Sequence, residues 1–90
     1  MDKINFYIGE QRYLDFEVRS TKKESFSIVD AHYIVTKRDG SVFDEGTATV
    51  TNGSTVRFLF NASEKGLFVV EVDATIPPEI ITYKGLINVS

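Results

Sequence analysis

Residues 55–75 read TVRFLFNASEKGLFVVEVDAT, and apolar and polar side chains alternate along both halves of this stretch. One parity holds the apolar residues on either side of a polar interval: Val56, Phe58 and Phe60, then Phe68, Val70, Val72 and Ala74. A period of two is typical of a β-strand that buries one face. The stretch therefore predicts two strands, Thr55 to Phe60 and Leu67 to Thr75, joined by a corner at residues 61–66.

The same alternation recurs elsewhere, in RYLDFEVRS at residues 12–20 and in EIITYKGLINV at residues 79–89. Turn signals separate such segments at Asp39-Gly40, Asn52-Gly53 and Pro77-Pro78. Turns every 8–12 residues without a helical period predict one all-β domain, residues 1–90, folded as an antiparallel β-sandwich of seven or eight strands. Its predicted core comprises Leu14, Phe16, Val18, Phe58, Phe60, Phe68, Val70, Val72 and Val89.

One segment breaks the alternation. Phe26 and Ile28 share one parity, whereas Ala31, Tyr33 and Val35 share the other. One extra residue in a strand moves every later side chain to the opposite face. We therefore expect a bulge or a strand-to-strand corner near residues 29–30, which would let Phe26 and Ala31 face the same core.

Composition excludes several classes of function. The chain has 90 residues, no cysteine and a net charge of −3. No basic cluster exceeds the pair Lys22-Lys23, which argues against a nucleic-acid partner. No apolar run approaches the ~20 residues of a membrane span, and the first residues lack the apolar region of a signal peptide. We expect a protein that folds by packing alone and is not secreted by a signal peptide.

The interval at residues 61–66 allows a second interpretation. Asn61-Ala62-Ser63 matches an N-glycosylation acceptor, as do Asn52-Gly53-Ser54 and Asn88-Val89-Ser90. The corner is favoured, because Ala62 is small enough to be buried beneath it and Gly66 permits an unusual backbone angle.

Residues that could bind metal are isolated. His32 is the only histidine, and a single histidine without cysteine does not make a typical zinc site. Asp39, Asp44 and Glu45 lack the spacing of a calcium loop, so a solvated hairpin is favoured. We expect no metal and no cofactor.

Glu71 and Asp73 are two residues apart on an outward face, as paired catalytic acids could be. The favoured interpretation is surface charge facing Arg57 or Lys84 on neighbouring strands, which contributes under ~1 kcal/mol. Without a nucleophile pattern or a phosphate-binding loop, we expect a protein that is not an enzyme.

Three segments carry a resemblance: GEQRYLDFEVRS, SFSIVDAHYIVTKRDGSVFDEGTATV and GLFVVEVDATIPPEIITYKGLINVS. Together they resemble the small immunoglobulin-like modules of bacteriophage and prophage structural proteins, in the style of upper baseplate N-terminal domains. The resemblance covers roughly residues 8–90. It implies an immunoglobulin-like sandwich and a non-enzymatic structural or assembly module of a tail, baseplate or head. Such a protein is made in the bacterial cytoplasm, resides in the virion, and binds other virion proteins or itself.

The chain departs from the immunoglobulin pattern at one corner. Such folds often place a tyrosine there, whose hydroxyl bonds to the corner backbone. Phe68 occupies the matching place and cannot make that bond, so we expect Asn61 or Ser63 to satisfy the corner instead.

An alternative function belongs to another class. Tyr7 and Tyr13 take the outward parity, and exposed aromatic rings can form a platform for sugars. Such a platform would indicate a receptor- or carbohydrate-binding domain of an adhesin on a bacterial surface. Ordinary exposed tyrosines are the simpler interpretation.

Some outward positions are apolar, where a sandwich strand should be polar. If the strands concerned are neighbours, their side chains would form one protein-interaction patch, because monomers rarely expose an apolar surface of several hundred Å². The predicted interface residues are Leu59, Leu67, Val69, Ile80 and Leu86. Burial of these residues by loops or termini is the alternative.

Overall fold

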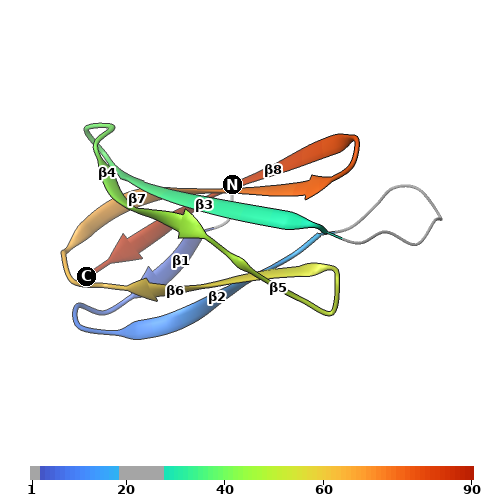
Figure 1. Ribbon diagram of the computed structural model, residues 1–90. Coiled ribbons are helices and arrows are strands. Elements are labelled where there is room, and N and C mark those ends of the chain that lie inside the picture. The colour runs from blue at the N-terminus through green and yellow to red at the C-terminus, as the bar shows by residue number, and fades with distance from the viewer. Residues whose placement is uncertain (1–2, 19–27) are drawn as a thin grey trace.

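The computed structural model describes residues 3–18 and 28–90, which form eight β-strands in two layers (Figure 1). In chain order they are β1 (Lys3–Phe6), β2 (Gln11–Glu17), β3 (Asp30–Lys37), β4 (Val42–Thr47), β5 (Thr49–Thr51), β6 (Thr55–Asn61), β7 (Gly66–Ile76) and β8 (Glu79–Val89). The predicted all-β sandwich and its strand number are confirmed.

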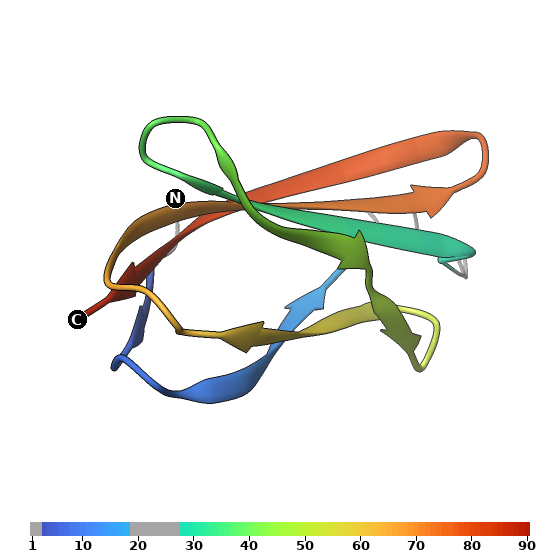
Figure 2. The same ribbon diagram turned by 60° about the vertical axis from the view of Figure 1, so that its left-hand side comes forward.

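The two sheets differ in size. Five strands pair in the order β1-β8-β7-β3-β4, and three pair in the order β2-β6-β5 (Figure 2). β1 runs parallel to β8, and every other pairing among the described strands is antiparallel. The expected all-antiparallel arrangement therefore has one exception. The arrangement is an immunoglobulin-like sandwich.

The core lies between the sheets and is rich in aromatic rings. Phe6 and Phe60 meet edge to face with ring centroids 5.0 Å apart, and the Phe68 ring lies 6.1 Å from that of Phe60. Eight of the nine predicted core residues are buried. Phe16 is half-buried, although Leu14 on the same face of β2 is buried. It still packs on Phe58, with parallel rings 6.0 Å apart.

The interval between β6 and β7 is the predicted corner. It carries the chain from the small sheet to the large one, and Ala62 within it is fully buried. The Ala62 carbonyl accepts a hydrogen bond from the Gly9 N–H, and the Ala62 N–H donates to the Glu10 carbonyl, both at 2.8 Å. The β1–β2 turn thus satisfies this backbone, and the expectation that Asn61 or Ser63 would do so is wrong for Ala62.

Gly66, which ends the corner, and Phe68 just after it have the conformation and the packing predicted from the sequence. Gly66 has φ +139°, a conformation that favours glycine, and no neighbouring atom crowds it. Phe68 points into the core, where its ring lies 4.6 Å from that of Phe43. The position that often holds a corner tyrosine therefore contributes packing in this protein.

The predicted change of phase is a corner between the sheets. Ile28 and Ala31 are both buried although they are three positions apart, an odd spacing. The Ile28 N–H donates to Gly53 beside the small sheet, and the Val29 N–H donates to Thr75 in the large sheet. The chain therefore changes sheets between residues 28 and 29, before β3 begins at Asp30. Phe26, which we expected to share this core, lies outside the described residues.

Candidate interaction surface

The outer face of the five-stranded sheet carries a band of aliphatic side chains across its centre. Val69 on β7 lies directly across from Leu86 on β8 and from Thr36 on β3, and Thr36 lies across from Val42 on β4. Ile34 and Leu67 are two residues from Thr36 and Val69, so they share the same face. We call the set the apolar band: Ile34, Val42, Leu67, Val69 and Leu86.

The predicted interface residues are only partly brought together. Leu67, Val69 and Leu86 are neighbours in the apolar band. Leu59 lies on β6, which belongs to the other sheet, so it points out of the opposite side of the sandwich. Ile80 lies across from Thr75 at the hairpin end of β8, six residues from Leu86. The prediction of one five-residue patch is therefore wrong, because β6 and β7 are consecutive in sequence but not in one sheet.

Two members of the apolar band were missed. Ile34 takes the parity opposite to Tyr33 and Val35, so the alternation along β3 contained a signal for it. Val42 is 52% exposed, and it joins the band only because the β3–β4 register shifts between Val35 and Thr36. No pattern in the sequence marks that shift.

Charges flank the apolar band on the same face. Glu71 on β7 lies across from Lys84 on β8, and Asp73 accepts a hydrogen bond from the Thr82 hydroxyl at 2.7 Å. The prediction that these acids face Lys84 is confirmed for Glu71. The Arg57 alternative is wrong, because Arg57 lies on the small sheet and binds Asp15. Paired with neighbours on an open face, Glu71 and Asp73 are surface charges.

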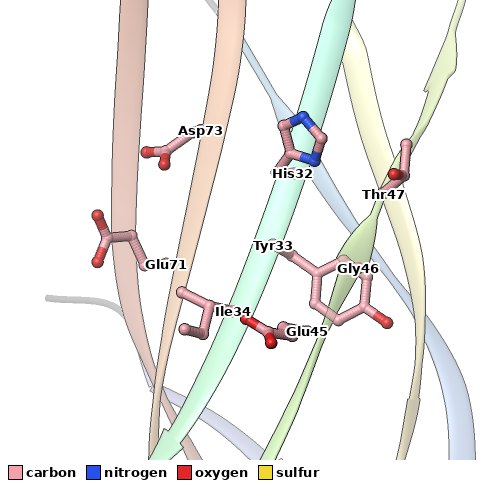
Figure 3. Close-up of a pocket in the computed structure, with 8 residues that line it drawn as sticks. All are labelled: His32, Tyr33, Ile34, Glu45, Gly46, Thr47, Glu71 and Asp73. Atoms are coloured by element: carbon pink, nitrogen blue, oxygen red, sulfur yellow. The ribbon is translucent and has the colours of Figure 1, made fainter. Parts of the chain in front are cut away.

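A shallow hollow of about 380 Å³ lies beside the apolar band on this face (Figure 3). Its side chains come from β7, β3 and β4, and the residues that line it are His32, Tyr33, Ile34, Glu45, Gly46, Thr47, Glu71 and Asp73. His32 is exposed, as predicted, and its Nε2 lies 2.9 Å from Asp30 Oδ2. Among residues 3–18 and 28–90, no group of three His, Cys, Asp or Glu side chains could hold a metal ion.

The three acids considered as calcium ligands have different surroundings in the structure. Asp39 accepts hydrogen bonds from the hydroxyl and the N–H of Ser41, which hold the pKa of its carboxyl below the usual value. Asp44 accepts a bond from the Tyr33 hydroxyl at 3.2 Å, and Glu45 lines the hollow on the outer face. Burial, and then the charge of Asp44 and its hydrogen bond, raise the pKa of Tyr33 above the usual value.

The two tyrosines of the sugar-binding alternative occupy different places. Tyr7 lies in the β1–β2 turn and is 74% exposed, whereas Tyr13 projects from the outer face of β2 and is 63% exposed. The Arg57 guanidinium carbon lies 5.2 Å from the centroid of the Tyr13 ring.

No helix long and apolar enough to cross a membrane is found in the described part of the chain.

The pair of Asp15 and Arg57 on the small sheet gives a pH prediction. The bond from Arg57 lowers the pKa of Asp15, so the pair contributes stability above the unfolded pKa of about 3.9, and this is lost as pH falls through the lower folded pKa. Both side chains are about half exposed, so we expect Asp15→Asn to cost under ~1 kcal/mol at pH 7. Urea unfolding of both proteins at pH 7 and near pH 2 checks this. An equal difference at both pH values would contradict it.

Comparison with solved structures supports the fold. An engineered protein solved at 1.98 Å for the Northeast Structural Genomics Consortium is similar with a TM-score of 0.78 and 10% identity, over 99% of this chain. This chain spans only 18% of that protein's length. CopC from Methylosinus trichosporium OB3b is similar with a TM-score of 0.72 and 12% identity, over 100% of this chain and 85% of its own.

Comparison of the sequence itself gives no family. No protein-family model matches the chain, and no curated protein matches it. At 10% and 12% identity, the structural likenesses show the immunoglobulin-like β-sandwich and nothing about activity or ligands.

Proposed function

We propose that this protein is a non-enzymatic structural or assembly module that acts through protein–protein contacts on the outer face of its five-stranded sheet. The observation that carries the proposal is the apolar band. Five aliphatic residues, four of them half-buried and Val42 exposed, gather on a face that a sandwich normally presents to water. An aliphatic centre with a charged rim is the usual anatomy of a protein interface.

We propose a bacteriophage or prophage virion as the setting, in a tail, baseplate or head. Support comes from the sequence resemblance and from the lack of cysteine, which suits a protein assembled in a reducing cytoplasm. The fold itself is used for many functions, so it favours no setting. The partners in this setting are other virion proteins or further copies of the chain.

The proposal is tested by site-specific photo-cross-linking in the cells that produce the protein. A photoreactive amino acid at position 69 should give cross-links to a defined protein in purified particles, because Val69 is at the centre of the apolar band. The same group at position 59, on the outer face of the other sheet, is the matched control. Equal cross-linking from both positions would contradict the proposed surface.

The adhesin alternative has its own observation, the exposure of Tyr7 and Tyr13. A glycan array distinguishes the two functions. Reproducible sugar binding that is lost in Tyr7→Ala or Tyr13→Ala would favour the adhesin, whereas the assembly module is expected to bind no glycan.

A further inference from the structure

We infer that the partner of the apolar band is a second copy of this chain, packed face to face about a twofold axis that runs between β7 and β8. The inference rests on the proposed function and names its partner. In this arrangement β7 of each copy lies over β8 of the other, so every contact occurs twice.

Two residues of the apolar band, Val69 and Leu86, match each other in this arrangement. Val69 and Leu86 lie directly across from each other within one copy. The twofold axis places Val69 of each copy over Leu86 of the other, which joins two aliphatic pairs into one cluster of four side chains. Leu67 lies beside the cluster on the same face of β7, where the axis places it over Asn88 of the other copy. Two sheets that pack in this way lie about 10 Å apart, which side chains of this size fill.

The charges also match. Glu71 and Lys84 lie across from each other one row away from the apolar pair. The same axis places Glu71 of each copy over Lys84 of the other, so four charges of alternating sign form a square. It also places Asp73 over Thr82, the residue whose hydroxyl already bonds to Asp73 within the copy. Like charges do not face each other in these rows, and this self-complementarity argues for a copy of the chain over an unrelated partner.

The available area suits a weak dimer. β7 and β8 have 11 residues each, and their neighbours β3 and β1 have 8 and 4. Together they offer a strip of roughly 550 Å². A standard stable interface needs about 800 Å² per partner. We therefore expect a dimer that forms at high concentration and dissociates on dilution.

The outer face of the small sheet lacks this pattern. Arg57 and Asp15 bind each other there, with Arg57 Nε 2.6 Å from Asp15 Oδ1. Leu59 is its only aliphatic residue on β6. This face therefore provides a matched control surface for mutations.

Sedimentation and light scattering of the purified chain, up to about 1 mM, test the inference. The wild type should approach the mass of a dimer at the highest concentration. Val69→Lys should remain a monomer, because it places charge in the aliphatic cluster, whereas Leu59→Lys should dimerise like the wild type. A wild type that stays monomeric, or an equal effect of the two lysines, would overturn the inference. Circular dichroism verifies that each variant is folded.

Charge reversal tests the arrangement independently. Lys84→Glu and Glu71→Lys should each weaken the dimer at least tenfold, since each places like charges in the square. The double variant restores alternating signs and should recover dimerisation. A double variant no better than the singles would overturn the twofold arrangement.

These results also separate the two proposals. If the wild type is a monomer but position 69 still cross-links to another virion protein in particles, the second copy is refuted and the proposed function stands. Loss of both results would refute the proposed function as well.

Discussion

Replacing Phe60 with alanine is expected to lower the free energy of unfolding by about 3–5 kcal/mol, the usual cost of removing a buried phenylalanine ring. Phe60 is fully buried and lies at the meeting point of three other rings, with Phe6, Phe43 and Phe68 between 5.0 and 6.1 Å away. Phe60 belongs to the small sheet, and the other three rings belong to the large one. The cavity left by Phe60→Ala would therefore remove ring contacts between the two sheets. A domain of this size has a margin of only about 5–10 kcal/mol.

Thermal unfolding followed by circular dichroism measures the effect. The melting temperature of Phe60→Ala should fall by more than ~10 °C, since 1 kcal/mol shifts a domain of this length by about 4–8 °C. Tyr7→Ala is the control, because Tyr7 is 74% exposed and its loss should change stability by less than ~0.5 kcal/mol. A Phe60→Ala protein as stable as the control would show that the two sheets do not pack through this residue.

Placing a carboxylate at position 70 is expected to unfold the protein at pH 7. Val70 is fully buried, between Val35 on β3 and Gly85 on β8. An unpaired charge at such a site costs several kcal/mol, which is comparable with the whole stability of the domain. Because burial raises the pKa of a carboxyl, the Val70→Asp variant should be less destabilised at pH 4 than at pH 7.

The neighbouring residue provides the matched control. Val69→Asp makes the same change one position earlier, on the outer face of the same strand, and should remain folded. Val70→Thr keeps the shape of valine and buries only a hydroxyl, so it should cost about 1–3 kcal/mol. Far-UV circular dichroism of the three variants is the measurement. A folded Val70→Asp, or an unfolded Val69→Asp, would contradict the assignment of the buried face of β7.

The sequence predicted the buried face of each strand because that information is local. Alternation in residues 55–60 and 67–75 follows from the backbone, which turns successive side chains to opposite sides. The same local argument located the corner at Ala62 and predicted a change of phase near residues 29–30, and the chain changes sheets between residues 28 and 29. This argument also placed Phe16 in the core, whereas the structure leaves Phe16 half-buried.

The composition of the candidate surface depends on which strands pair, and this is not local information. Alternation gave Leu59 and Val69 the same outward parity, and nothing near either residue records which sheet its strand joins. Pairing is decided by residues far apart in the chain: β7 pairs with β3, more than 30 residues earlier, while β6 pairs with β2 in the other layer. The sequence therefore determined which side chains leave the core, and only the tertiary structure decided which of them meet, because hydrogen-bonded register is a property of two strands together.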